Sequence, residues 1–346
     1  MKIFNFKYME YSKLNFLLLI MMMMSTTITV TSTSWISAWM GMEINLMTFI
    51  PLMMMKNKLF KSSNSMMTYF MIQSSSSCML LLLIMMYKME LNIINMNYIN
   101  MMIQLSLLMK LGAAPFHWWT PKIINFMNWK NCFMLLTWQK INPLIMISMT
   151  KISNLIYYSI MMSTMIGAIL GLNQTSLKLL ITYSSINHIA WLMISMMMNL
   201  TIFIMYFIIY SMSLFMICMM LNNFNIKFLN QLMKNNNYNM FLKINTLMMF
   251  LSLSGIPPML GFFPKFKVLM LMIKNQLFLE SLLFILFSLI ILSYYLNPMI
   301  SMMMLNKMNS KWMTTKFNYM NYIFMIMLIN LSLMMIIIMP MEQTLN

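Results

Sequence analysis

Long apolar runs, separated by short polar clusters, recur along the chain from Leu14 to Met339. Many of them reach the roughly 18 residues that an α-helix needs to cross the hydrocarbon core of a bilayer. Barrel strands would be short and would alternate between apolar and polar residues, so the pattern excludes a transmembrane barrel. We therefore predict an all-α, polytopic membrane protein with about 11 transmembrane helices, near residues 14–33, 35–55, 65–87, 98–121, 132–148, 154–172, 177–198, 200–221, 244–273, 277–296 and 320–339.

Glycine and proline interrupt the fourth and the ninth of these spans, so the interruptions recur after five spans. A unit with an odd number of helices places its second copy upside down in the membrane, which is the inverted-repeat plan of transporters. The pattern thus predicts inverted five-helix repeats with two broken helices. The predicted domains are an N-terminal segment at 1–13, a first repeat at 14–150, a second repeat at 151–298, and a loop with a C-terminal helix at 299–346.

Prolines near intramembrane lysines predict unpaired backbone carbonyls beside each lysine. The proline–lysine groups are Pro115 with Lys110, Pro143 with Lys140, and Pro257, Pro258 and Pro264 with Lys265. The carbonyls that these prolines leave free are those of Leu111, Gln139, Leu253, Ser254 and Leu260. Such backbone is tolerated at membrane depth only against protein or water, so all three lysines are expected to lie in a protein interior.

Composition supports the membrane assignment, because 61% of the 346 residues are hydrophobic and only 8% are charged. Soluble domains carry about 25% charged residues. The formal charge of +17 reflects membrane topology, since loop lysines gather on one side, and nucleic-acid binding is not expected. The N-terminal side collects Lys2, Lys7, Lys13, Lys56, Lys58, Lys61, Lys122, Lys130, Lys178, Lys227, Lys234, Lys243, Lys307, Lys311 and Lys316, and the opposite side collects Lys88, Lys151 and Lys274.

Methionine occupies 59 positions, whereas Arg and Asp are absent. A genetic code that reads ATA as Met would produce this bias, and such codes are mitochondrial; the alternative is that Met replaces Leu as a flexible apolar filler. The first reading predicts a multi-pass protein of the mitochondrial inner membrane. The lysine distribution then places the N-terminus in the matrix and the C-terminus in the intermembrane space.

Five ionisable residues lie within predicted spans and are candidates for a proton relay: Glu43, Lys110, Lys140, Lys265 and His188. Inserting a charged side chain at the centre of a membrane helix costs about 3 kcal/mol, and chains of such groups relay protons in pumps. Structural alternatives compete for each residue. Glu43 could serve only as an ion-pair partner, and Lys110 and Lys265 could lie at shallow half-helix ends. Lys140 could extend its side chain to the membrane interface, and His188 could be a satisfied core residue.

Other polar residues are assigned to the membrane surface. Lys267 and Glu280 are expected at the interface, and Trp118, Trp119 and Trp312 are expected to anchor in the headgroup region.

The chain offers no ligand set for a redox cofactor or a metal. Its three cysteines are isolated in apolar runs, and there is no phosphate-binding loop or dinucleotide-binding motif. With only two histidines, His117 and His188, the bis-histidine haem helices of the cytochrome b type are excluded. We therefore expect no cofactor or metal bound by this chain, and no electron transfer through it.

Repulsion between two lysines is too small to drive a proton across the membrane by itself. Two lysines about 10 Å apart would repel by roughly 1.7 kcal/mol at an effective dielectric near 20. Moving one charge against about 100 mV takes roughly 2.3 kcal/mol. A conformational drive from elsewhere is therefore expected.

Six segments resemble the chain 2 family of mitochondrial NADH:ubiquinone oxidoreductase, the complex I subunits related to cation/proton antiporters. They are WMGMEINLMTFIP (39–51), KLGAAPFHWW (110–119), LLTWQK (135–140), GLNQT (171–175), YSSINH (183–188) and GIPPMLGFFPK (255–265). The resemblance covers about residues 35–266, and the KLG…APFH segment is its most specific part.

This resemblance implies an antiporter-like fold in the membrane arm of complex I, next to other membrane-arm subunits and lipids such as cardiolipin. It also implies that Glu43 and Lys110 form a coupling pair, that Lys140 is the central relay lysine and that Lys265 is the exit-side lysine. The chain departs from the family at Lys122, where an acidic residue usually follows the proline, so a role for that acid in proton entry is in doubt here.

Quinone reduction elsewhere in the complex would then drive proton translocation by this chain. Two alternatives remain open: a sibling subunit that exchanges monovalent cations for protons, and a scaffold of the membrane arm in which the lysines form structural ion pairs.

Overall fold

The computed structural model describes residues 2–54, 59–88, 96–234, 240–257 and 259–306. Within these ranges the chain is built from helices, with no strand, as the long apolar runs predict. The chain divides into two compact units, residues 1–159 and residues 160–346, and each is described separately.

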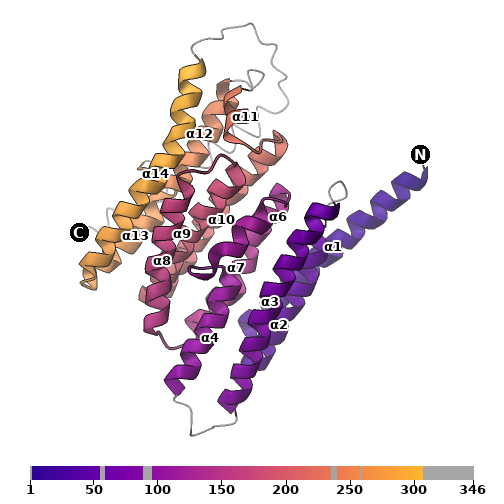
Figure 1. Cartoon of the computed structure of the whole chain (residues 1–346), viewed down its shortest axis with the longest axis vertical. Helices are drawn as coiled ribbons and strands as arrows, with labels where there is room; N and C mark the ends of the chain where they lie inside the picture. Colours follow the sequence, from indigo (N-terminus) through magenta and orange to yellow (C-terminus); the bar gives the residue numbers. More distant parts are fainter. Residues whose placement is uncertain (1, 55–58, 89–95, 235–239, 258, 307–346) are drawn as a thin grey trace. The chain divides into compact units, whose positions relative to one another are not determined.

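The first unit contains eight helical elements and the beginning of a ninth. They are α1 (Lys2–Thr31), α2 (Trp35–Leu52), α3 (Leu59–Lys88), α4 (Met96–Leu111), the 3₁₀ turn η1 (Phe116–Trp118), α5 (Trp119–Ile124), α6 (Trp129–Leu136), α7 (Trp138–Ser148) and the first turns of α8 (Asn154–Gly171). Figure 1 shows α1, α2 and α3 as long neighbouring rods, and α7 packs against α1, α2 and α4.

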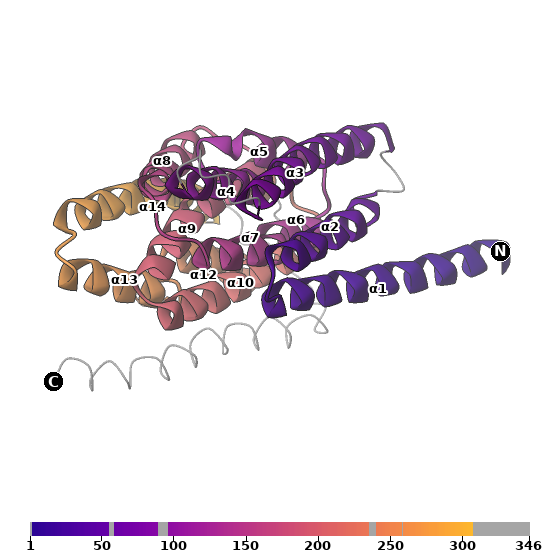
Figure 2. The same cartoon turned by 90° about the horizontal axis from the view of Figure 1, so that it is seen from below.

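The second unit begins within α8 and has α9 at its centre. Its further helices are α9 (Leu177–Met198), α10 (Leu200–Asn223), α11 (Leu229–Lys234), α12 (Met240–Ser254), α13 (Phe262–Lys274) and α14 (Phe278–Asn306). Helix α9 packs against α10 and α13, while α14 packs against α12 and α13; Figure 2 shows α13 and α14 side by side.

Short polar residues begin several of these helices, which accounts for where they start. Ser34 caps α2 by accepting from the Ser37 amide at 3.3 Å, and Ser176 caps α9 by accepting from the Leu179 amide at 3.4 Å. Asn199 caps α10 through the Thr201 amide at 2.9 Å. Side-chain oxygens at these positions satisfy amides that the first helical turn leaves without partners.

Seven helical stretches of the described part are long and apolar enough to cross a membrane. They are Leu14–Thr31, Ser63–Lys88, Met96–Ile124, Asn154–Gly171, Leu177–Met198, Leu200–Asn223 and Phe278–Asn297. The first ten predicted spans all coincide with helices or helix pairs, and the eleventh, 320–339, lies outside the described residues. The all-α, polytopic fold is confirmed, while the two inverted repeats stay a prediction.

The two expected helix interruptions are present. The fourth span divides into α4 and α5, and the ninth divides into α12 and α13. A third interruption was not among the two broken helices predicted, and it does not lie at Gln139, where Pro143 was expected to free a carbonyl. The fifth span divides into α6 and α7 at Thr137, whose backbone angles are φ −118° and ψ −68°. The Thr137 hydroxyl donates to the Phe133 carbonyl at 2.7 Å, and such bonds bend helices.

Candidate functional site

Lys110 lies at the end of α4, immediately before the first interruption, and is buried. Its ammonium nitrogen lies 4.0 Å from the sulfur of Met42 on α2. The carbonyl of Lys110 accepts a hydrogen bond of 3.2 Å from the amide of Gln73 on α3. The backbone of Lys110 is therefore anchored, whereas its charged group faces a weak and polarisable acceptor.

Gly112 ends α4 because it adopts a backbone conformation that other residues rarely take, with φ at +68°. The amides of Gly112 and Ala113 turn back to the Leu108 carbonyl at 3.1 and 3.3 Å. The indole of Trp119 donates to the Met109 carbonyl at 3.2 Å. Several carbonyls at this helix end thus have partners, and the terminus is closed by protein groups as expected for a buried end.

Glu43 lies on α2, one residue from Met42, and is partly buried. Its carboxylate acts electrostatically on the Lys110 ammonium and on the hydroxyl of Tyr69 in α3. Among the described residues, Glu43 and Lys110 form no direct ion pair, and the Oε1 atom of Glu43 is buried without a hydrogen-bond partner. The two charges of the predicted coupling pair are therefore near each other but separated.

Gln139 connects three helices of the first unit through its side chain. Its amide nitrogen donates to Asn45 Oδ1 at 3.0 Å, and its oxygen accepts from the Tyr69 hydroxyl at 3.3 Å. The same nitrogen lies 3.6 Å from the sulfur of Met22 on α1. These residues form one polar network, which reaches α2 two positions from Glu43.

Lys140 follows Gln139 on α7 and is buried, with 3% of its surface exposed. It is the third residue after the interruption at Thr137, and its amide bonds to the Thr137 carbonyl at 3.1 Å. We expected the disturbance in this span to lie at Gln139, where Pro143 removes a donor; α7 instead continues through Pro143 and the break lies two residues earlier. The interior position predicted for Lys140 is nevertheless the observed one.

Lys265 lies on α13 in the second unit and closes the end of α12. Its ammonium donates a hydrogen bond of 2.6 Å to the carbonyl of Ser254, the last residue of α12, and Lys265 is buried. The Ser254 carbonyl is one of those that the prolines were expected to free. The contact predicted from the sequence is therefore present, with the lysine as a partner of the freed carbonyl.

Gly255 makes room for this contact. Its φ is +82°, and a Cβ atom at this position would lie 2.9 Å from both Cδ and Nζ of Lys265. Two constraints thus select glycine: the backbone conformation and the space that the lysine occupies.

His188 lies in the middle of α9 and is buried. Its Nδ1 atom is 2.9 Å from the hydroxyl of Tyr206 on α10, and its ring centre is 4.8 Å from that of Tyr210. Trp191, one turn further along α9, packs against Tyr206 and against Phe284 of α14. His188 therefore joins α9 to α10 through an aromatic and hydroxyl cluster, an arrangement compatible with either a relay or a structural role.

Three residues differ from their assigned positions or were missed. Trp119 was expected at the headgroups, but it is buried because its indole caps α4, whereas Trp118 is exposed and stacks under the Lys122 ammonium at 5.2 Å. Lys178 was assigned to a loop, but it is buried at the start of α9. Tyr69 was not singled out, although Tyr69 and Gln73 are polar residues four positions apart, hence on one helix face.

Among the described residues, no group of three His, Cys, Asp or Glu side chains is placed to hold a metal ion. The expectation that this chain binds no cofactor stays a prediction.

The family model and the sequence relatives that match this chain agree on one family. A sequence model described as "NADH:quinone oxidoreductase/Mrp antiporter, TM" matches residues 32–293. NADH-ubiquinone oxidoreductase chain 2 of Anopheles gambiae is 41% identical over 290 residues, which is 83% of this chain and 85% of the relative. The protein of the same name from Locusta migratoria is 39% identical over 290 residues, with the same coverage of both chains.

Solved structures share the fold at low sequence identity. A chain of respiratory complex I from Thermus thermophilus has a TM-score of 0.74 at 18% identity, covering 84% of this chain and 70% of its own length. A chain of the Mrp complex from Dietzia sp. has a TM-score of 0.72 at 13% identity, covering 82% of this chain and 59% of its own length. An archaeal membrane-bound sulfane sulfur reductase has a TM-score of 0.77 at 14% identity, with coverages of 92% and 72%.

Proposed function

We propose, from the premise that this chain belongs to the NADH:quinone oxidoreductase/Mrp antiporter transmembrane family, that it is a proton-translocating subunit in the membrane arm of an NADH:ubiquinone oxidoreductase. Relatives that cover most of its length are named as chain 2 of that enzyme. Its substrate is the proton, and quinone reduction elsewhere in the complex supplies the drive.

One observation carries this proposal: three buried lysines lie at helix interruptions inside apolar helices. Lys110 precedes the break at Gly112, Lys140 follows the break at Thr137, and Lys265 closes the break between α12 and α13. Placing an ionisable group inside the membrane costs several kcal/mol, so such groups are rare there. Those that are kept mark the pathways of transported ions and protons. In transporters, corresponding interrupted helices mark the transport pathway, and here the Lys265 ammonium bonds directly to a backbone carbonyl at such an interruption.

Each relay residue has an assigned role in this proposal. Glu43 and Lys110 form the coupling pair, because the carboxylate acts on the ammonium without contacting it and so changes how readily the ammonium releases its proton. Lys140 is the central acceptor, and His188 and Lys265 continue the relay in the second unit.

The chain itself performs no redox chemistry and binds no cofactor in this proposal. We place it in the mitochondrial inner membrane, with the N-terminus in the matrix and the C-terminus in the intermembrane space, because of the lysine distribution and the methionine-rich composition. Its partners are other membrane-arm subunits and lipids such as cardiolipin.

Replacing Lys140 tests the proposal most directly. In the assembled complex, Lys140→Ala should lower NADH-driven proton pumping on the order of tenfold, at the lower end of what positioned proton-transfer groups contribute. Lys130→Ala is the matched control, because Lys130 lies on neighbouring α6 and is exposed. Unchanged pumping per NADH and unchanged coupled turnover in Lys140→Ala would refute the relay and favour a scaffold.

Exchange of a monovalent cation for protons is the second candidate function, favoured by the structural likeness to a chain of an Mrp complex. An imposed sodium gradient across vesicles that contain the assembled complex should leave internal pH unchanged if the chain only relays protons. Sodium-driven proton movement that Lys140→Ala abolishes would establish the exchanger instead.

A further inference from the structure

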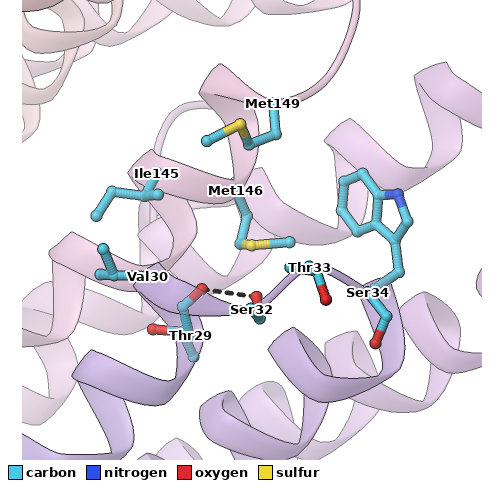
Figure 3. A pocket seen from close by; sticks show the side chains of 9 residues that line it. Thr29, Val30, Ser32, Thr33, Ser34, Ile145, Met146 and Met149 are labelled. Atoms are coloured by element: carbon cyan, nitrogen blue, oxygen red, sulfur yellow. Dashed lines mark hydrogen bonds between the residues drawn. The ribbon is translucent and has the colours of Figure 1, made fainter.

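A cavity of about 190 Å³ opens in the first unit where α1 ends and turns into α2 (Figure 3). Hydroxyl side chains of α1 and of this turn form one side, and Ile145 and Met146 of α7, with Met149 directly after it, form the other. The lining residues are Thr29, Val30, Ser32, Thr33, Ser34, Trp35, Ile145, Met146 and Met149. The cavity has room for several waters and offers them hydroxyl partners. In the predicted topology it opens on the lysine-poor side of the membrane.

The polar wall of this cavity continues into the protein through Thr29. Ser32 donates to the Thr29 carbonyl at 2.8 Å, and the Thr29 hydroxyl lies 2.9 Å from Oδ1 of Asn142 on α7. Thr29 lines the cavity, yet Thr29 and Asn142 are both buried, with 3% and 1% of their surfaces exposed. Thr29 thus joins the cavity to a buried amide.

The hydrogen-bond count at this junction requires a further partner. The Thr29 hydroxyl has one proton and lies 2.8 Å from the Thr26 carbonyl, to which a helical threonine commonly donates. Asn142 then presents its nitrogen to Thr29, and its oxygen takes the other position, where the amide atom is buried without a partner. In either amide orientation one polar atom of Asn142 needs a water molecule.

The same face of α7 leads from Asn142 to the carboxylate network. Gln139 lies three positions before Asn142, and residues three apart are neighbours on a helix surface. Gln139 is bonded to Tyr69 on α3 and to Asn45 on α2, the helix that also carries Glu43. The Oε1 atom of Glu43 is also buried without a partner. Polar atoms without a partner therefore occur at Asn142 on α7 and at Glu43 on α2, the helix that Gln139 contacts through Asn45.

Gly41 allows the helices beside this route to approach closely. A Cβ atom at Gly41 would lie 2.5 Å from Cγ2 of Thr29 and 3.1 Å from the carbonyl oxygen of Ser25. The backbone of α2 therefore packs directly on α1 where Thr29 turns toward α7, and the threonine methyl is held in place.

We propose that Ser32, Thr29, Asn142, Gln139, Asn45 and Glu43 line a hydrated proton passage between this cavity and the Glu43 carboxyl group. The inference rests on the proposed function and adds an access route that ends at Glu43. A proton leaves the Glu43 carboxyl group, is accepted by an adjacent water, and moves to the cavity as the excess proton of the water chain; the carboxylate remains, and uptake is the reverse. The hydroxyls and amides hold the waters and keep their own charge, so Thr29 is a positioning residue.

Removing the Thr29 hydroxyl tests the passage. Thr29→Val keeps the methyl group against Gly41 and should lower NADH-driven proton pumping in the assembled complex about fivefold, the factor that one hydrogen bond of ordinary strength is worth. Thr29→Ser restores the hydroxyl and should restore pumping. Thr27→Val is the matched control, because Thr27 is exposed on the same helix. Equal pumping in Thr29→Val and the wild type would overturn the proposal.

Blocking the cavity gives a second, independent test. In Ser32→Cys, a membrane-impermeant thiol reagent added from the cavity side should inhibit coupled turnover, since the label fills the passage. Thr31→Cys is the control, because Thr31 is exposed nearby but does not line the cavity. Labelled wild type accounts for the exposed native Cys78. Complete labelling of Ser32→Cys with unchanged turnover would refute the passage.

The experiments distinguish failure of the proposed passage from failure of the proposed function. If Lys140→Ala lowers pumping as expected while the Thr29 and Ser32 variants behave as wild type, the relay stands and the passage is wrong. If Lys140→Ala pumps normally, the proposed function itself is wrong.

Discussion

At the interruption between α4 and α5 in the first unit, the buried lysine stands before the break, whereas at the interruption between α12 and α13 in the second unit it stands after the break. Lys110 ends α4 and has its ammonium beside a methionine sulfur, with its own carbonyl held by Gln73. Lys265 lies in the first turn of α13 and donates a hydrogen bond from its ammonium to the carbonyl of Ser254 at the end of α12. A glycine with positive φ follows the first half-helix in both cases, Gly112 at +68° and Gly255 at +82°.

The different partners of Lys110 and Lys265 represent two ways of stabilising a charged side chain inside the membrane. Lys265 satisfies a backbone acceptor and thereby joins two half-helices, so its charge is part of the local structure. Other side chains close the end of α4, so the Lys110 ammonium is left to respond to Glu43. The comparison predicts that the second lysine matters more for stability, and that the first matters mainly for coupling.

The largest effect is expected for Gly255→Ala. The positive φ costs about 1–2 kcal/mol for a residue with a side chain. The new methyl group also displaces Lys265 from Ser254, because its place lies 2.9 Å from Lys265 Nζ. The amount of assembled complex and the turnover of what assembles should both fall.

Gly112→Ala is the matched variant for this test. It has a similar backbone penalty, but its methyl group meets the Thr120 and Trp119 side chains and not the lysine. It should reduce assembly and leave turnover per assembled complex less affected. Equal loss of turnover in both variants would show that the lysine contact at Gly255 has no special importance.

A smaller effect is expected for Lys265→Met, which leaves the buried Ser254 carbonyl without its lysine donor. Losing the partner of a buried acceptor costs about 1–3 kcal/mol. Lys110→Met removes a charge that holds no backbone carbonyl, so it should hardly change the thermal stability of the purified complex while lowering coupled turnover. Thermal unfolding of the two variants side by side measures the difference. Equal shifts in melting temperature would contradict the distinction between the two sites.

The smallest effect is expected for Gln73→Met, which removes the donor to the Lys110 carbonyl. The loss of one ordinary hydrogen bond predicts a stability decrease of about 1 kcal/mol. Gln174→Met serves as the control, since Gln174 makes an exposed hydrogen bond to the Leu170 carbonyl. A change no larger than that of the control would mean that the end of α4 is held by its glycine and by Trp119 alone.

The sequence predicted the helices and two of the three interruptions, because apolar runs and Gly–Pro clusters are local signals. It also predicted that Lys265 would meet a carbonyl freed by a proline. The interruption at Thr137 has no glycine or proline and depends on a hydroxyl bonding back to Phe133, which any threonine in a helix can do. No local pattern distinguishes the threonines that interrupt a helix from those that do not.

The polar network around Glu43 could be predicted only in part. Glu43 and Lys110 were identifiable because charge in an apolar run is rare. Tyr69, Asn45 and Gln139 became recognisable only when α2, α3 and α7 were seen together, since each looks like an ordinary polar residue in its own helix. Burial of Trp119 likewise depends on a contact ten residues away along the chain, at Met109.

Helix α9 is more deeply buried in protein than a lipid-facing membrane helix, and this burial limits how its sequence can change. Protein surrounds it on nearly every side, since 18 of its 22 residues are buried. Ser184, Ser185, Asn187 and His188 therefore meet neighbouring side chains in place of lipid tails. A lipid-facing helix tolerates the exchange of one apolar residue for another, whereas each replacement in α9 must fit the closely packed side chains around it. We therefore expect the fewest evolutionary substitutions in α9.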